Sequence, residues 1–227
     1  MLKFAPILLA LLYAVGLWRF SAWRTARELD ARSTELRDPA LAEVTGRLAR
    51  ALGVARVPVR VYEIPMVNGL AAPDGRIFLT RGFLDRFRAG QVTAEELASV
   101  IAHELGHVAL GHSRRRMIDF TGQNAIRVML ATIRGRLVPG IGVWIANLLT
   151  SLVAARLSRR DEYEADEWAS ALLVKAGIGT GPQKALFAKL GRLTGGGSAP
   201  AWLLSHPATA DRITAIEANE AKWGLRR

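Results

Sequence analysis

The chain has 227 residues, 50% of them hydrophobic, so it can form one domain with a substantial core, with or without a short appendage. It contains no cysteine, which excludes disulfides, thiolate metal ligands and lipid attachment to cysteine. The net charge of +11 does not indicate a nucleic-acid partner, because the arginines are scattered and no basic motif with interleaved aromatic residues is present. A basic surface lying against anionic membrane lipid explains the charge more economically.

The N-terminal residues 4–18 form an uncharged apolar run. This run reaches the roughly 20 residues of a membrane span only if Lys3 and Arg19 extend their charges towards the headgroups. A cleaved signal peptide is the alternative, although no small-x-small cleavage site follows the run. We therefore predict a transmembrane anchor, or else a signal sequence, over residues 1–24 and a folded domain over residues 25–227.

The charges that flank this run predict its orientation. Lys3 and the α-amino group precede it, whereas it is followed by Arg19, Arg24, Arg27 and Arg32. By the positive-inside rule, a single-pass protein of a bacterial-type inner membrane with this pattern has its C-terminal domain in the cytoplasm. Export of that domain to the periplasm is the alternative.

The next residues predict one helix and a small sheet. An Asp-Pro pair begins a helix over residues 38–52, and Gly53 ends it. Alternating valines predict a short strand over residues 57–61, and residues 68–71 and 76–80 are typical of a hairpin around an Asp-Gly turn. An exposed edge of that hairpin could pair with an extended peptide of almost any sequence. The candidate substrate-binding residues are therefore Asn68, Gly69, Leu70 and Ala71.

An H-E-x-x-H pattern is the most informative feature of the chain. Thr93 and Glu96 form a capping box, and apolar residues then recur at three- and four-residue steps, which predicts a helix. His103 and His107 lie roughly 40° apart on one face of that helix, so both imidazoles can bind one metal ion. Glu104 beside them is placed to activate a water molecule at the metal without being a ligand itself.

A third ligand must lie elsewhere, because catalytic zinc usually has three protein ligands. His112 is a poor candidate: on a continued helix it points about 140° away from His107, and we predict that it is structural or solvent-facing. A second helical segment, ended by Gly177, carries Glu162 and Asp166 on one face. One of these carboxylates can bind the metal while the other accepts the outer N–H of a ligating histidine. The alternative is a solvated acidic face, and the residues that suit it better are Asp161, Glu164 and Glu167.

Residues 137–155 are uncharged and long enough to span a membrane. A full crossing would place His107 and Glu162 on opposite sides of the bilayer. If both bind one ion, the segment is instead a buried helix, a re-entrant loop or an interfacial helix. Further along, a glycine-rich connector at residues 195–198 precedes a last helix opened by Pro207.

The pair of motifs H-E-L-G-H and S-R-R-D-E-Y-E-A-D resembles the HtpX-like and type I CAAX prenyl endopeptidase family, zinc metallopeptidases of the glutamate-zincin group. Residues 68–77 are similar to that family's N-A-F-A…G-G-x-I strand pair, with Gly-Leu in place of Ala-Phe. Residues 205–213 resemble its H-P-P-x-x-x-R-[IL] motif, with alanine in place of the second proline. The resemblance spans roughly residues 40–220.

This resemblance implies an α+β fold, a mainly helical zincin-like metallopeptidase domain with a small β-sheet, and one zinc ion per chain. It implies that Glu162 is the third metal ligand and that Asp166 supports the ligands. It also implies that His206 is catalytic, as a donor to the oxyanion that forms during hydrolysis, and that Arg212 orders the site.

Together these features predict a membrane-associated zinc endopeptidase that cleaves unfolded or membrane proteins in quality control or turnover. Zinc at His103, His107 and Glu162 would polarise the scissile carbonyl, and Glu104 would take the water's proton and deliver it to the leaving amine. One alternative is a metal-free membrane chaperone or scaffold of the same fold, which the intact ligand set argues against. The other is a prenyl-peptide processing protease, although its relatives use a large multi-span chamber.

Overall fold

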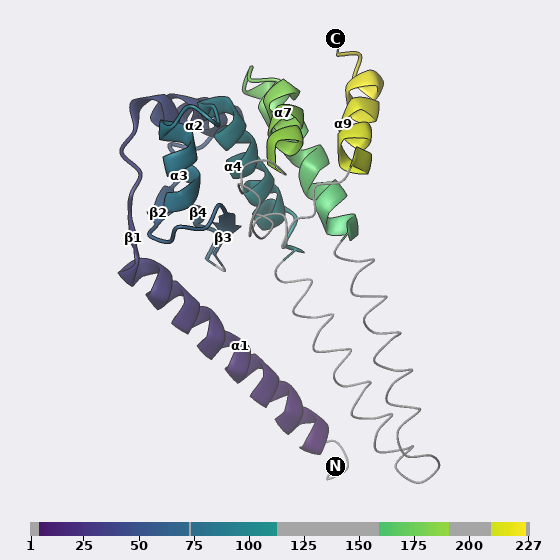
Figure 1. The fold of residues 1–227 in the computed structure, drawn as a ribbon. Coiled ribbons are helices and arrows are strands. Elements are labelled where there is room, and N and C mark those ends of the chain that lie inside the picture. Colours follow the sequence, from purple (N-terminus) through teal and green to yellow (C-terminus); the bar gives the residue numbers. More distant parts are fainter. Residues whose placement is uncertain (1–4, 73, 113–158, 191–209, 226–227) are drawn as a thin grey trace, which may run out of the picture.

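The computed structural model describes residues 5–72, 74–112, 159–190 and 210–225 of the chain. Helices dominate, and one four-stranded sheet accompanies them, so the predicted α+β class is confirmed (Figure 1). In chain order the elements are α1 (Ala5–Ala31), β1 (Ser33–Glu35), α2 (Pro39–Leu52), β2 (Val59–Tyr62), β3 (Gly69–Ala71), β4 (Ile77–Thr80), α3 (Arg81–Arg88), α4 (Ala94–Ala109), a helix at residues 159–175, α7 (Gly181–Leu190) and α9 (Ala210–Lys222).

The sheet is mixed, with the strand order β1-β2-β4-β3. Its two central strands, β2 and β4, run parallel, and the outer strands β1 and β3 are antiparallel to their neighbours. The predicted hairpin is confirmed: Leu70 of β3 lies opposite Phe78 of β4, and Gly75 adopts a φ of 86° in the turn between them. Within the described residues β3 is therefore an edge strand.

The sequence signals for helix ends agree with the structure. The Asp38 side chain accepts hydrogen bonds from the first backbone N–H groups of α2, and Gly53 ends that helix with a left-handed φ of 72°. Thr93 and Glu96 form the predicted capping box at the start of α4. The 159–175 helix stops before Gly177, whose φ is 69°.

Three elements were not predicted, namely β1, α3 and α7. β1 has only 3 residues and is mostly exposed, so neither apolar content nor alternation marks it. α3 begins directly after β4, with no glycine or proline to separate the two. Local pattern alone therefore identifies long amphipathic elements better than short connecting ones.

The core lies between α2, α4, the sheet and the 159–175 helix. Its largest fully buried side chains include Leu41, Leu48, Ile77, Leu79, Phe83, Leu97, Ile101, Leu173, Leu186 and Leu190. Burial of one such side chain stabilises the fold by roughly 1.5–3 kcal/mol. α4 is buried without interruption from Glu96 to Glu104, so the histidine motif lies on one of the most firmly packed elements.

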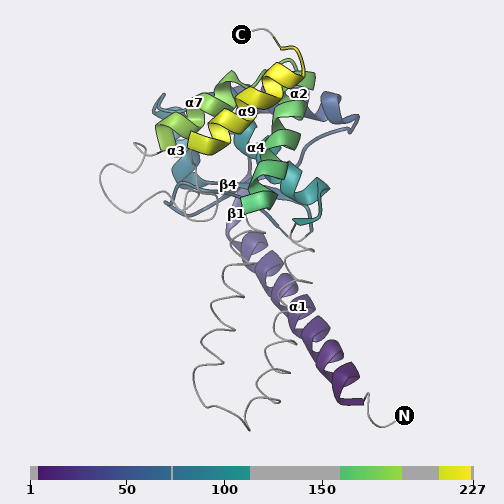
Figure 2. The ribbon, with the colours of Figure 1, turned by 90° about the vertical axis from the view of Figure 1, so that its right-hand side faces the viewer.

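α1 projects away from the rest of the described chain, as two perpendicular views show (Figures 1 and 2). Its C-terminal end is attached to the sheet. Leu29 is buried there, and the Tyr62 hydroxyl donates a hydrogen bond to Glu28 Oε1 at 3.1 Å. Asp30 forms an ion pair with Arg76, next to the β3–β4 turn. These contacts fix where α1 leaves the domain.

Among the helices described here, none is both long and apolar enough to cross a membrane. The anchor predicted over residues 1–24 is thus not found as a span, although residues 5–24 lie within α1. The predictions for residues 137–155, the connector at 195–198 and Pro207 fall outside the described residues, and the last helix is described as α9.

Candidate metal centre

The two histidines of the H-E-x-x-H motif lie side by side on α4, as their spacing predicts. His103 Nε2 and His107 Nε2 are 3.0 Å apart, and the two rings meet nearly edge to face, at 84°. Both side chains are buried. The ring nitrogens that face each other are the atoms through which histidine binds metals.

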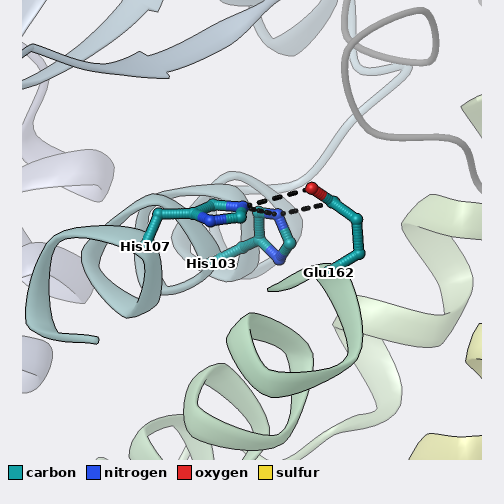
Figure 3. Close-up of side chains that lie close together, drawn as sticks. All are labelled: His103, His107 and Glu162. Atoms are coloured by element: carbon teal, nitrogen blue, oxygen red, sulfur yellow. Dashed lines mark hydrogen bonds and ion pairs between the residues drawn. The ribbon is translucent and has the colours of Figure 1, made fainter. Parts of the chain in front are cut away.

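The 159–175 helix brings a carboxylate to the same point, as Figure 3 shows. Glu162 Oε2 lies 3.3 Å from His103 Nε2, and Glu162 Oε1 lies 3.5 Å from His107 Nε2. Zinc bonds of about 2.0–2.1 Å in a tetrahedron separate neighbouring ligand atoms by about 3.3–3.4 Å. The two ring nitrogens and the Glu162 carboxylate therefore have the chemistry, and a spacing close to that, which a metal ion with three protein ligands requires.

Two small residues allow the ligand-bearing helices to approach each other. A Cβ atom on Gly106 would stand 3.0 Å from the carbonyl oxygen of Ala165 and 3.2 Å from its Cα. Ala165 is itself fully buried. The backbones of the two helices therefore nearly touch where they cross. On α4 this crossing point lies between His103 and His107, and on the 159–175 helix it lies close to Glu162. A larger side chain at either position would move the donors apart.

Asp166 and Arg212 support the donors from behind. Asp166 Oδ1 lies 2.9 Å from Nδ1 of His103, the ring nitrogen that faces away from Glu162. Arg212, on α9, donates two hydrogen bonds to Asp166, at 2.6 and 2.8 Å, and its Nη1 lies 3.4 Å from Glu162 Oε2. The guanidinium stacks on Phe187 at 4.6 Å from the ring centre. The structure thus places both predicted supporting residues next to predicted ligands.

This network shifts two pKa values in opposite directions. Burial lowers the pKa of His103, but hydrogen bonds to Asp166 and Glu162 outweigh it and raise that pKa to about 9. Burial raises the pKa of Asp166, but hydrogen bonds from Arg212 and His103 hold it below its usual range. In the metal-free protein His103 is therefore a cation in a mostly anionic pocket, and a metal cation can take the place of its proton.

Glu104 is buried where β3 packs on α4. A Cβ atom on Gly69 would stand 3.8 Å from Cγ of Glu104 and only 2.5 Å from Cγ1 of Val100. The start of β3 is fixed by Thr80, whose Oγ1 accepts from the Asn68 backbone N–H and donates to its carbonyl, both at 2.9 Å. The edge strand with the predicted substrate-binding residues therefore passes beside the predicted catalytic base.

Sequence reasoning was wrong about Asp161, which we expected on a solvated face and which is buried. For His112 the structural alternative holds and the solvent-facing one does not, because only 1% of its surface is exposed. Glu164 is partly exposed and pairs with Arg160, but it also contacts His112, which was not expected. The signal that could have identified His112 is its position, the third histidine within ten residues of a chain that has only 4. His206 lies outside the described residues.

Comparison with protein families gives an independent indication. The model of peptidase family M48 matches residues 35–220, a range that includes both metal motifs and most of α9. The match therefore extends well beyond the histidine motif. It covers the strands β2, β3 and β4, helix α4, the 159–175 helix and the supporting Arg212.

Individual relatives agree with this match. Metalloprotease LoiP of Escherichia coli (strain K12) is 33% identical over 210 residues, which cover 89% of this chain and 80% of LoiP. Metalloprotease YcaL of the same strain is 31% identical over 174 residues, which cover 75% of this chain and 66% of YcaL. Protease HtpX of Pseudomonas aeruginosa (strain LESB58) is 26% identical over 238 residues, which cover 86% of this chain and 77% of HtpX.

Proposed function

The chain belongs to peptidase family M48 and is a metalloendopeptidase, and from this premise we propose that it is a membrane-associated, zinc-dependent enzyme that cleaves unfolded or membrane proteins in quality control or turnover. One observation carries the proposal. The buried ring nitrogens of His103 and His107 lie 3.0 Å apart, and each lies 3.3–3.5 Å from one of the two carboxylate oxygens of Glu162, beside the glutamate of the H-E-x-x-H motif. That arrangement serves metal-assisted peptide hydrolysis.

We assign one zinc ion per chain to His103, His107 and Glu162. Two imidazoles and one carboxylate are a donor set typical of catalytic zinc, which keeps one further position open. Zinc supplies Lewis-acid chemistry there, since it polarises a peptide carbonyl and acidifies a water molecule. The protein's part is to hold the three donors in place, with Asp166 and Arg212 behind them.

Glu104 is the proposed general base. Glu104 lies on α4, the same rigid helix that carries both histidines. Because it directly follows His103, helical rotation turns its side chain to a different side. Its carboxylate would accept a proton from the attacking water and later deliver that proton to the departing amine. Glu104 is buried beside β3, and this burial supports its role as the base. Where bulk water is largely excluded, the carboxylate acts only on the few water molecules that the site admits.

The substrate backbone would pair with the edge strand β3. Asn68 and Gly69 lie at its start beside α4, and Leu70 and Ala71 are half-buried along it. Among the described strands β3 pairs with β4 alone, which leaves its other edge for an extended peptide. Backbone pairing tolerates many side chains, in keeping with unfolded proteins as substrates.

His206 is the proposed oxyanion donor, on the strength of the family resemblance of residues 205–213. During hydrolysis the carbonyl oxygen becomes negatively charged, and an N–H donor stabilises that charge more than it stabilises the substrate. Arg212 follows His206 by six residues in the sequence and lies on α9, where it donates hydrogen bonds to Asp166.

Membrane association would depend on α1. Its exposed apolar side chains include Leu12, Tyr13, Val15, Phe20 and Trp23. Arg27 stacks on Trp23 at 5.0 Å, a pairing of cation and aromatic ring that suits the lipid headgroup region. We propose that α1 attaches the domain to an inner membrane, with the peptidase domain in the cytoplasm; a periplasmic domain is the alternative.

The decisive experiment replaces Glu104 by Gln in the full chain. The amide keeps the size of the carboxylate but cannot act as a base, so cleavage of an unfolded protein such as casein should fall at least about a hundredfold. Zinc content, measured by mass spectrometry of the purified protein, should stay near one per chain in both forms. As the matched control, His103→Ala should lose both zinc and cleavage. Full cleavage by Glu104→Gln would contradict the proposed role of Glu104.

A further inference from the structure

His112 returns to the site because α4 ends before it. The helix stops at Ala109, and Gly111 adopts a φ of 66°, a left-handed conformation that turns the chain back. His112 is consequently directed at His107 and not 140° away from it, as a continued helix would direct it. The two rings meet at 71°, with centroids 4.9 Å apart.

The contacts of His112 connect His107 to two carboxylates. Nδ1 of His112 lies 2.8 Å from Nδ1 of His107. Its other nitrogen, Nε2, lies 3.3 Å from Glu164 Oε2 and 3.9 Å from Asp161 Oδ1. Glu164 is oriented by Arg160, whose Nε donates to Oε1 at 2.7 Å. A continuous chain of polar atoms therefore runs from His107 to the start of the 159–175 helix.

The proton positions along this chain follow from the metal centre. A neutral histidine that binds a metal through Nε2 carries its proton on Nδ1. The Nδ1–H group of His107 must then donate to Nδ1 of His112, which accepts only if the His112 proton is on Nε2. That Nε2–H group faces the Glu164 and Asp161 carboxylates, which are acceptors.

We propose that His112 is a positioning residue of the metal centre, which fixes the tautomer and ring orientation of His107 and is itself oriented by Glu164 and Asp161. This inference rests on the proposed role of His107 as a metal ligand. Each ligating histidine then has its own outer partner, which is a carboxylate for His103 and a neutral imidazole for His107. Such outer hydrogen bonds typically change metal affinity by 10–100-fold.

A second metal ion bound by His112, Asp161 and Glu164 is the competing interpretation, because their donor atoms also lie within 4.8 Å of one another. Two contacts favour the positioning role. Nδ1 of His112 is directed at His107, and Arg160 already supplies a positive charge to Glu164. The two interpretations predict different metal contents, one or two ions per chain.

The test compares His112→Asn with His112→Leu in the full-length protein. The Asn oxygen can accept the His107 N–H from nearly the position of Nδ1, whereas Leu fills the space and accepts nothing. In competition with a chromophoric zinc chelator, His112→Leu should bind zinc 10–100-fold more weakly than the parent, and His112→Asn within a few-fold of it. Long-range ¹H–¹⁵N spectra of histidine-labelled, zinc-loaded parent protein should show His107 protonated on Nδ1 and His112 on Nε2.

Three results would overturn the proposal. Equal zinc affinity in His112→Leu and the parent would remove the positioning role while the metal centre stands. Two zinc ions in the parent that fall to one in His112→Asn would establish a second metal site instead. A proton on Nδ1 of His112 would contradict the hydrogen-bond order even if the Leu variant failed to fold. A parent protein that binds no zinc would instead refute the proposed metal centre itself, and so is distinguishable from the other three.

Discussion

Asp166 is a buried carboxylate whose charge is balanced from two sides, by Arg212 and by His103. A buried charge is tolerated only when it is paired and hydrogen-bonded, and removal of one partner from such a pair typically costs about 3–5 kcal/mol. Because its pKa is held below 3.8, Asp166 contributes to stability above that pH and loses this contribution as acid protonates it. The residues behind the donors thus stabilise the fold while they orient His103.

The metal-free protein should lose stability as pH rises, whereas the stabilisation provided by zinc should increase. Without metal, His103 has a pKa of about 9 against an ordinary 6.5, so its contribution to folding is fully present below pH 6.5 and is lost as pH rises towards 9. A proton and zinc compete for His103, so the stabilisation that zinc binding provides should increase as pH rises over the same range.

Urea midpoints measured between pH 6 and pH 9.5, with and without zinc, check this prediction. The midpoint of the metal-free form should fall with rising pH, and the difference between the two forms should grow. A metal-free midpoint that rises across this range would contradict the proposed charge state of His103.

At the scale of elements, the crossing of α4 with the 159–175 helix sets the metal geometry. Ala165→Leu should separate the two backbones, since Gly106 and Ala165 are already in near-contact. Overpacking of this kind lowers the free energy of unfolding by about 1–3 kcal/mol. Displacement of Glu162 should weaken the free energy of zinc binding by more than this loss of stability. The measurements are the chelator-competition affinity and the urea midpoint.

Ala171→Leu is the matched control, because it adds the same atoms to an exposed alanine of the same helix. It should leave the zinc affinity unchanged. If Ala165→Leu kept the parent affinity for zinc, the near-contact of the two backbones would not control the ligand geometry.

A change at the contact between β3 and α4 should lower the rate of peptide cleavage and leave the zinc content unchanged. In Gly69→Ala the new methyl would lie 2.5 Å from Cγ1 of Val100, so β3 must shift away from the helix that carries Glu104. We expect peptide cleavage to fall about tenfold or more, because small displacements of a bound substrate cost much in rate. Zinc content should not change.

The double variant Gly69→Ala with Val100→Ala provides the control, because it removes the Val100 Cγ1 methyl group with which the methyl group added at position 69 would clash. It should recover much of the lost cleavage. No recovery would mean that Gly69 acts through something other than its fit against Val100.

For the whole molecule, the sequence predicted the features that depend on periodicity along one helix. The four-residue spacings His103–His107 and Glu162–Asp166 each determine a shared helix face, and the structure places all four side chains in one buried cluster. The helix caps at Asp38 and Gly53 were also predictable, because they depend on local backbone chemistry.

The features that depend on chain reversal or on contact between distant elements were not predictable. His112 was misplaced because the turn at Gly111 ends the helix that the prediction continued. The near-contact of Gly106 with Ala165 joins positions in separate helices, and no local pattern indicates it. Arg212 reaches Asp166 from α9, so only the family resemblance could suggest its role.

The orientation of the whole molecule at a membrane yields the last prediction. The arginines that follow the apolar run, Arg19, Arg24, Arg27 and Arg32, outnumber the single Lys3 before it, so the domain should stay in the cytoplasm. A reporter enzyme active only in the periplasm, fused after Arg227, should give little activity in a bacterial host. A reporter active only in the cytoplasm, fused at the same residue, should give a strong signal and serves as the matched control. The reverse pair of results would place the domain outside the cytoplasm. Residues 1–24 would then act as a signal sequence or as a span inserted in the opposite direction, and the basic surface would no longer face the anionic inner leaflet.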